Sequence, residues 1–465
     1  MSHARAPLAA VTLLALALSG CDGDEKAGGD GEALATAAPA AATTLPSGLP
    51  APYLSGLIPY DVPPRPDSAE TPEESRPWFD SFSWQMFIAL NWPASDEGRG
   101  RASFPMDSTH FLSASNGTPV VWGTYKASWE LFDQDTLRPT PFDDWNSPVE
   151  PCGGVQAQHR VLAFSSKGNS VMEESVEAFS YPLVDQQNNY ARFEVRYNRI
   201  QYDTIRGPDR DPNRWLYLTR NWLGNVPFQM PASDSTHAGS IMVKAAWRPM
   251  TALDDTTRYY TRPAQVVDSA GACSTVTMGL VGFHVAAKLT TFPQWIWSTF
   301  EHVSNVPGAG AAGPPYSFNN GADTPATPGG WANRPDSTAL MPPNRRRPTQ
   351  VTRLNDIPST PAGSSTQDIN EIYRQFLSRT VWTNYQLVMT QWPSDPGTAV
   401  LPDSGGVYPR DAGGAFPQYG ATNTSMETYF QSRGDAQGAG GNSCMQCHWQ
   451  AGKTDFSWGM NRRAH

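Results

Sequence analysis

The stretch Thr275-Val-Thr-Met-Gly-Leu-Val-Gly-Phe-His-Val-Ala-Ala-Lys-Leu289 is long, apolar and partly β-branched. β-Branched side chains fit the pleated surface of a sheet, and a nearly continuous apolar run is typical of a strand covered on both faces. We therefore expect this stretch to form a central strand of a large sheet.

Strands are also predicted on both sides of this stretch. Residues 192–197 alternate charged and apolar side chains, which is the pattern of a half-buried strand. Asn188-Asn189 predicts a turn just before them. Further strands are expected at 240–248 and 258–268, and Val381 to Trp392 is predicted to be another.

Few helices are predicted, and most are short. Apolar residues at helical spacing predict one helix near Trp78 to Leu90. The clearest helix runs from about Ser365 to Thr380, with one apolar stripe and a capping-box pattern at its start. The pattern Thr424-x-x-Glu427 predicts a short helix near Thr424 to Gln431, and Trp122 to Phe132 fits either a strand or a short helix.

The composition favours the same fold class. Charged residues make up only 17%, whereas Gly 39 and Pro 42 are plentiful, which favours loops, turns and sheet over long helices. We expect an α+β fold that is mainly β, with a large antiparallel-sheet body over residues 53–420 and a long loop near 307–365. The net charge of −10 argues against nucleic acid as a partner.

The N-terminus has the pattern of an export signal. Arg5 precedes an apolar run from Leu8 to Leu18, which predicts a signal peptide over residues 1–20. Leu18-Ser19-Gly20-Cys21 resembles a bacterial lipobox, in which the Cys carries the acyl chains; the alternative is an ordinary secretory signal with an incidental Cys.

The lipobox interpretation has consequences for location. Residues 21–52 are rich in Ala, Gly, Thr and Pro and predict a flexible tether. We expect an exported protein of the periplasm or cell envelope, anchored to a membrane by lipid on Cys21.

The chain has five cysteines. Two of them, Cys152 and Cys273, belong to no motif, and in an oxidising compartment they are candidates for a disulfide. The alternative is two unrelated buried thiols.

The motif Cys444-Met445-Gln446-Cys447-His448 carries the chemistry. C-x-x-C-H is the attachment signature of c-type haem, because two thiols on one helical turn reach both vinyl groups and the next imidazole lies beneath the iron. Ser443 is a candidate N-cap for that turn. The alternatives are a thioredoxin-type dithiol and half of a zinc site. The Gly-rich residues 434–442 and the lack of a second nearby Cys/His pair count against both.

Several phrases resemble those of a group of uncharacterised bacterial single-haem cytochrome c proteins. They are Asn423 to Gln431, Ser443 to His448, Asp455 to Trp458, Phe87 to Pro93 and Trp295 to His302. The resemblance implies one covalent haem c, held by Cys444 and Cys447 with His448 as an axial iron ligand. It says little about a reaction.

The position of the motif limits the fold around it. Because His448 lies so near the C-terminus, the chain has no room for a small class I cytochrome c fold, whose Met ligand lies well downstream of the motif. We expect residues 421–465 to form a haem-bearing tail on the larger body.

The sixth iron ligand decides the function. The candidates are His302, His284 and Met460. A filled site favours electron transfer with a redox partner protein or a small-molecule donor or acceptor. An open or displaceable site favours a haem enzyme, such as a peroxidase or small-molecule oxidoreductase, and a third alternative is a non-catalytic binding or sensor module. Whether the protein is an enzyme stays open at this point.

Overall fold

The computed structural model describes much of the chain between Leu45 and Gly459. The described residues are 45–65, 71–104, 108–114, 116–132, 139–145, 160–161, 182–207, 229–267, 272–308, 315–321, 348–397, 414–418, 420–431, 443–449, 451 and 454–459. The chain divides into two units, Met1–Ala42 and Thr43–His465, and all described residues belong to the second. The predicted signal peptide, Cys21 and most of the predicted tether therefore lie outside the described residues.

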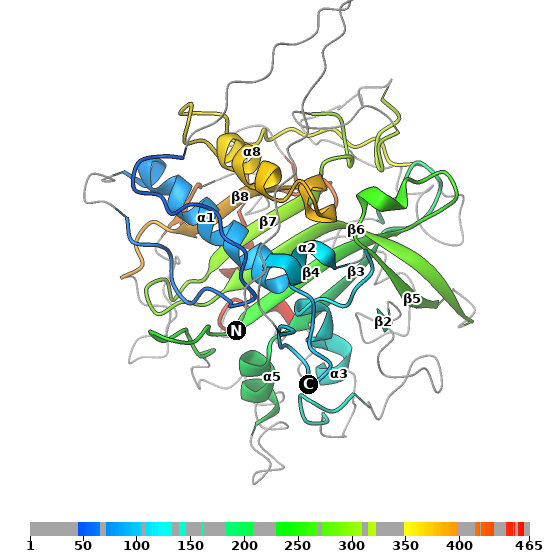
Figure 1. Ribbon diagram of the computed structural model, residues 1–465, viewed down its shortest axis with the longest axis horizontal. Coiled ribbons are helices and arrows are strands. Elements are labelled where there is room, and N and C mark those ends of the chain that lie inside the picture. Colours follow the sequence, from blue (N-terminus) through cyan, green and yellow to red (C-terminus); the bar gives the residue numbers. More distant parts are fainter. Residues whose placement is uncertain are drawn as a thin grey trace, which may run out of the picture. The chain divides into compact units, whose positions relative to one another are not determined.

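A large, mainly antiparallel sheet forms the centre of the second unit (Figure 1). In spatial order its main strands are β1 (Lys126–Ala127), β3 (Arg192–Tyr197), β4 (Ile241–Pro249), β6 (Cys273–Ala287), β7 (Ile296–His302), β8 (Tyr385–Pro393) and β9 (Ala415–Phe416). Strand β5 (Thr261–Val267) also pairs with β6, and β2 (Arg160–Val161) runs parallel to β5. The sheet confirms the predicted α+β, mainly β fold class, which is not that of a small helical cytochrome.

Strand β6 is the central strand, as predicted. Along one edge it pairs with β4, and along the other its first half pairs with β5 and its second half with β7. Gly282 lies where the C-terminal segment presses on β6: a Cβ there would stand 2.3 Å from Ser425 Oγ. A glycine at this position therefore permits the close approach.

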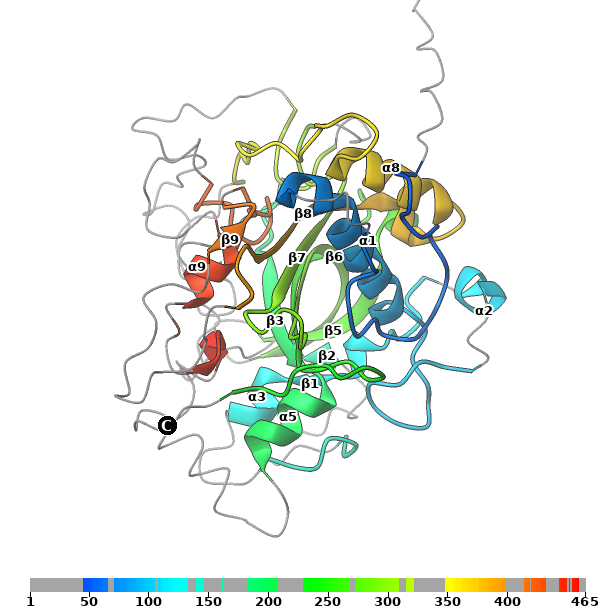
Figure 2. The same ribbon diagram turned by 90° about the vertical axis from the view of Figure 1, so that its left-hand side faces the viewer.

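Two helices cover one face of the sheet (Figures 1 and 2). They are α1 (Pro72–Leu90) and α8 (Thr366–Phe376), and each begins with a capping box, as predicted for the second. Trp84 of α1 stacks on Tyr373 of α8 at 5.3 Å between ring centroids, and Phe87 packs on Phe283 and Phe300 of the sheet. Aromatic side chains thus join both helices to the strands beneath them.

The C-terminal part of the chain covers the opposite face (Figure 2). The strand β7 shows the division, because its side chains alternate between the faces. Ser298 bonds to Ser83 of α1, whereas Trp297 contacts His448 and Thr299 accepts a hydrogen bond from Asn423. The motif helix α9 (Cys444–Trp449) therefore lies across the sheet from α1.

The remaining elements are short. They are α2 (Ser108–Ser113), η1 (Trp122–Thr124), α3 (Ser128–Phe132), α5 (Arg199–Arg206), η2 (Thr256–Arg258) and η4 (Val381–Asn384). Much of the loop predicted near 307–365 lies outside the described residues. No helix in the described part of the chain is both long and apolar enough to cross a membrane.

The strand predicted from Val381 begins only at Tyr385, because Val381–Asn384 form η4. Two further sequence predictions about local structure are wrong. Strand β3 is not half-buried, because its charged residues are buried as well: Arg196 donates to Glu194 at 2.7 Å and to the carbonyl of Tyr125 at 2.6 Å. The ion pair and the hydrogen bonds offset the cost of burying these charges. Residues 424–430 form successive turns instead of a helix, and Asn423, not Thr424, accepts from the backbone that follows.

Candidate functional site

The helix α9 holds the predicted motif in a single short turn of chain. Ser443 caps it: its carbonyl accepts from the amide of Cys447 at 3.0 Å, and its Oγ accepts from the amide of Gln446 at 3.3 Å. The side chain satisfies a donor that the helix leaves unpaired, so the predicted N-cap is confirmed.

Gln391 fastens the start of α9 to the sheet. Its Oε1 accepts from the amide of Met445 at 2.8 Å and from Ser443 Oγ at 3.2 Å, and its Nε2 donates to the carbonyl of Pro417 at 2.7 Å. Met445 points into the core and is 1% exposed. Of the other motif side chains, Gln446 is exposed, whereas Cys444, Cys447 and His448 are half-buried.

Neither motif cysteine forms a disulfide, and both are half-buried. Burial, together with the carboxylate of Glu427, raises the pKa of the Cys444 thiol. A reactive redox dithiol needs the opposite environment, one that lowers the pKa of the attacking thiol. The surroundings of Cys444 thus count against a thioredoxin-type dithiol.

The ring of His448 has a fixed orientation. Its Nδ1 lies 2.8 Å from the carbonyl oxygen of Phe456, which can only accept, so Nδ1 carries the proton and Nε2 carries the lone pair. Trp297 packs on the ring at 4.4 Å between centroids. Burial lowers the pKa of His448 to about 4, which keeps the imidazole neutral near pH 7.

The carbonyl of Phe456 is in turn held by a buried anchor. Asp455 and Phe456 both have left-handed backbone, with φ of 49° and 66°, which side chains other than glycine rarely adopt. The carboxylate of Asp455 accepts from Lys288 Nζ at 2.6 Å, from the amide of Met230 at 2.7 Å and from Trp295 Nε1 at 3.3 Å. These contacts over-determine the strained turn that presents the carbonyl to His448.

This anchor was missed in the sequence analysis. In the sequence, Asp455 to Trp458 stands out only as part of the resemblance, and Lys288 lies at the end of a predicted strand. The two partners are 167 residues apart, and no spacing pattern links them.

The structure brings His284 to the motif. His284 Nε2 lies 2.9 Å from Glu427 Oε1, and Lys244 stands beside His284 on the neighbouring strand. The pKa of His448 responds to the charges of three neighbouring groups, Lys244, His284 and Glu427. All three therefore lie within electrostatic reach of its ring. Because Nε2 of His284 is hydrogen-bonded to Glu427, only Nδ1 of this ring is available to bind a metal in this arrangement.

His302 is not brought to the motif. It is fully buried at the end of β7 farthest from Ile296, and it stacks on Tyr259 at 3.9 Å between centroids. Its Nε2 donates to the carbonyl of Arg258 at 2.9 Å, and its Nδ1 accepts from the amide of Ser304 at 3.1 Å. Both ring nitrogens are thus taken by backbone, and the proposal of His302 as an iron ligand is wrong.

The other predicted site residues are only partly described. Met460, Cys21 and Cys152 lie outside the described residues. Cys273 is disulfide-bonded, whereas Cys444 and Cys447 form no disulfide, so the motif does not supply its partner. The pairing of Cys152 with Cys273 stays a prediction.

The comparisons with known proteins add no relative. No protein-family model matches the chain, and neither a search of curated proteins nor one of solved structures gives a match. Within the described ranges, no group of three or more His, Cys, Asp and Glu side chains is arranged to hold a metal ion by itself. A proposal about function therefore rests on the residues of the motif and on their surroundings.

Proposed function

We propose that this protein carries one covalent c-type haem on Cys444 and Cys447, with His448 as an axial iron ligand. The hydrogen bond from His448 Nδ1 to the carbonyl of Phe456 is the observation that supports this most. An axial histidine binds iron through one ring nitrogen while the other donates to a fixed acceptor, which sets the tautomer and the orientation of the ring.

The surroundings of the motif also suit a haem. The two thiols lie one turn apart on α9, are half-buried and are not joined in a disulfide. Aromatic rings surround the motif: Trp297 packs on the ring of His448, and Trp449 packs on Phe456. The iron of a bound haem supplies one-electron chemistry, and the protein's own part is to fix the ligand and to limit the access of water.

We further propose that the protein is an exported electron-transfer lipoprotein anchored through Cys21. Its partner is then a redox protein or a small-molecule electron donor or acceptor. The anchored imidazole supports this proposal, because a rigid ligand limits the structural change that accompanies a change of charge on the iron.

A haem enzyme is the second candidate, and the pair of His284 and Glu427 is the observation that favours it. An imidazole hydrogen-bonded to a carboxylate can accept and return a proton next to a substrate. The ring lies near the motif, while its Nε2 is occupied by Glu427. In this case the sixth iron position is open or displaceable.

Absorption spectra test both candidates. The full chain is produced in a host competent in cytochrome maturation, and cyanide, CO and peroxide are then added to the purified protein. A low-spin spectrum that none of them alters supports electron transfer. A high-spin ferric spectrum that they do alter supports the enzyme.

Substitutions at the motif test the cofactor itself. Cys444→Ala with Cys447→Ala is expected to abolish covalent attachment, and His448→Ala to change the spectrum of the remaining coloured protein. His237→Ala is the matched control, because that ring is exposed and its partner Asp234 is equally on the surface. Wild-type protein that releases its colour into acidified solvent overturns the proposal.

A further inference from the structure

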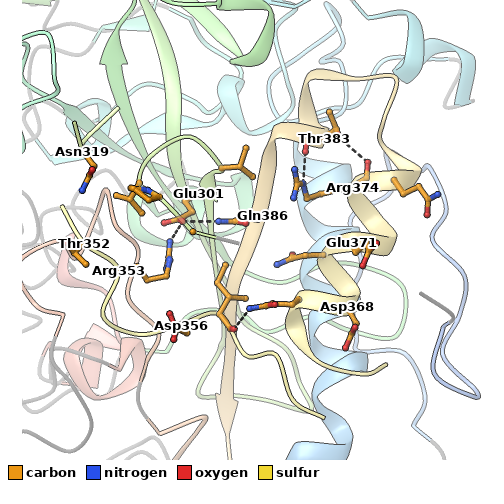
Figure 3. A pocket seen from close by; sticks show the side chains of 18 of the residues that line it. Glu301, Asn319, Thr352, Arg353, Asp356, Asp368, Glu371, Arg374, Thr383 and Gln386 are labelled. Atoms are coloured by element: carbon orange, nitrogen blue, oxygen red, sulfur yellow. Dashed lines mark hydrogen bonds and ion pairs between the residues drawn. The ribbon is translucent and has the colours of Figure 1, made fainter. Parts of the chain in front are cut away.

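A second site lies away from the motif, at the end of the sheet beside α8 (Figure 3). It is a cavity of about 950 Å³ between α8, the ends of β7 and β8, and the loop that contains Arg353 and Asp356. Its size suits a small organic molecule. Neither the sequence motifs nor the proposed haem accounts for it.

The floor of the cavity is a buried ion pair. Glu301 is 1% exposed, and its carboxylate accepts from Arg353, from Gln386 Nε2 at 3.2 Å, and from the amide and hydroxyl of Thr424 at 3.1 and 2.7 Å. Because the protein already supplies four donors to this carboxylate, Glu301 is a partner for Arg353 and not a free ligand group.

Arg353 has an unused donor at the floor. Its side chain is 9% exposed, and Nη1 is buried with no hydrogen-bond partner in the described structure, whereas Nη2 contacts Glu301. A buried N–H without an acceptor is costly, and a guanidinium suits the two oxygens of a carboxylate. An acceptor on a ligand in the cavity would therefore satisfy Arg353 Nη1.

The opposite wall offers a second cation. Arg374 of α8 donates through Nε to the carbonyl of Thr383 at 2.8 Å, which holds the guanidinium toward the cavity (Figure 3). Arg353 and Arg374 thus face the space from two sides. The walls between them are polar. The side-chain amides of Asn319, Gln367 and Gln386 donate to protein acceptors, whereas Gln375 and Ser378 are exposed.

The acidic side chains limit the charge of a ligand. Besides Glu301, the lining includes Asp356, Asp368 and Glu371. Asp368 is used by the cap of α8, whereas Asp356 and Glu371 are exposed at the rim. A rim of this sign repels anions with two or more charges but tolerates a single carboxylate that reaches the arginines.

We propose that this cavity binds a small hydroxylated monocarboxylate of the sugar-acid class. Its carboxylate contacts Arg353 Nη1 and Arg374, and its hydroxyl groups bond to the amide oxygens of Gln367 and Gln386 and to the exposed side chains of Gln375 and Ser378. The proposal stands apart from the haem, because no lining residue belongs to the motif.

Titration calorimetry on the intact protein tests the proposal. The probes are gluconate and galacturonate, with glucose as the neutral analogue and inorganic phosphate as the simple anion. We expect saturable binding of at least one sugar acid, and weaker or no binding of glucose and phosphate. No saturable binding of either sugar acid up to roughly 50 mM, or equal binding of phosphate, overturns the proposal.

Three variants locate the site. Arg353→Lys keeps a positive charge next to Glu301 but loses the second donor, and we expect affinity to fall about tenfold without unfolding. Arg374→Ala is expected to weaken binding by a similar factor. Arg379→Ala removes a nearby exposed arginine that does not line the cavity, and it is expected to bind like the wild type. Unchanged affinity in both Arg353→Lys and Arg374→Ala contradicts the assignment.

Discussion

At the scale of single residues, the proposed haem site depends on how one imidazole is held. The ring of His448 is set by a carbonyl, the carbonyl by a strained turn, and the turn by Asp455 with its three buried donors. Each step is a short-range contact, and together they link α9 to Lys288, the residue that follows strand β6. A substitution at Lys288 or Asp455 should therefore change the orientation of the His448 ring, although the ring is bonded to neither residue.

Asp455→Asn tests this linkage. The variant leaves the buried ammonium of Lys288 without its counter-charge, so we expect the free energy of unfolding to fall by about 3–5 kcal/mol. We also expect the absorption bands and the midpoint potential of the loaded protein to shift. Adding Lys288→Met to this variant should restore much of the stability but not the spectrum. A spectrum identical to the wild type in both variants contradicts a positioning role for Asp455.

The two candidate histidines should behave differently. His284→Ala is expected to change the spectrum or its response to CO, because His284 lies within electrostatic reach of His448. His302→Phe should leave the spectrum unchanged and lower stability by about 1–3 kcal/mol, since it removes partners from the buried Ser304 amide and the Arg258 carbonyl. Chemical denaturation combined with absorption spectra checks both. The reverse pattern would restore His302 as a ligand.

At the scale of elements, a buried carboxylate joins three of them. Asp80 of α1 accepts from Thr366 of α8 and from Thr390 of β8, each at 2.7 Å. Burial raises the pKa of Asp80 to about 6, above its ordinary value of 3.8, while these two hydrogen bonds act in the opposite direction. The folded state therefore binds this proton more tightly than the unfolded state does.

The sign of this shift gives a pH dependence. The contribution of Asp80 is fully present below about pH 4 and is lost as the pH rises through about 6, by up to about 3 kcal/mol. Asp80→Asn should remove that loss, because the amide does not ionise. Urea unfolding of both proteins at pH 4, 5, 6 and 7 measures the difference. A constant difference in stability across this range would be inconsistent with a raised pKa.

Local sequence patterns predict the type of each element better than they predict which residues it packs against. Strand β6 and helix α8 were predicted because period and apolar content are properties of a short stretch. The buried charges of β3 were not, because Glu194 and Arg196 find partners on Trp247 and Tyr125, which lie far away in the sequence. The turns over 424–430 were mistaken for a helix because the cap belongs to Asn423, one residue earlier than the pattern placed it.

At the scale of the whole molecule, the sheet separates two chemically different faces. One face carries α1 and α8 over an aromatic core, and the other carries the motif helix and the segment 420–431 (Figure 2). That segment touches both proposed sites: Thr424 bonds to Glu301 at the floor of the cavity, and Glu427 bonds to His284 near the motif. The cysteine–histidine motif was visible in the sequence because its spacing is local. The cavity was not, because its lining comes from parts of the chain that only the fold brings together.

The central claim is that one haem is joined to this polypeptide through Cys444 and Cys447. Intact-mass measurement under denaturing conditions, followed by digestion and sequencing of the peptide that contains Cys444 to His448, tests it most directly. We predict a polypeptide that is heavier by one haem, with the added mass on that peptide alone. A polypeptide of unmodified mass, after production in a host shown to mature another c-type cytochrome, would contradict the claim.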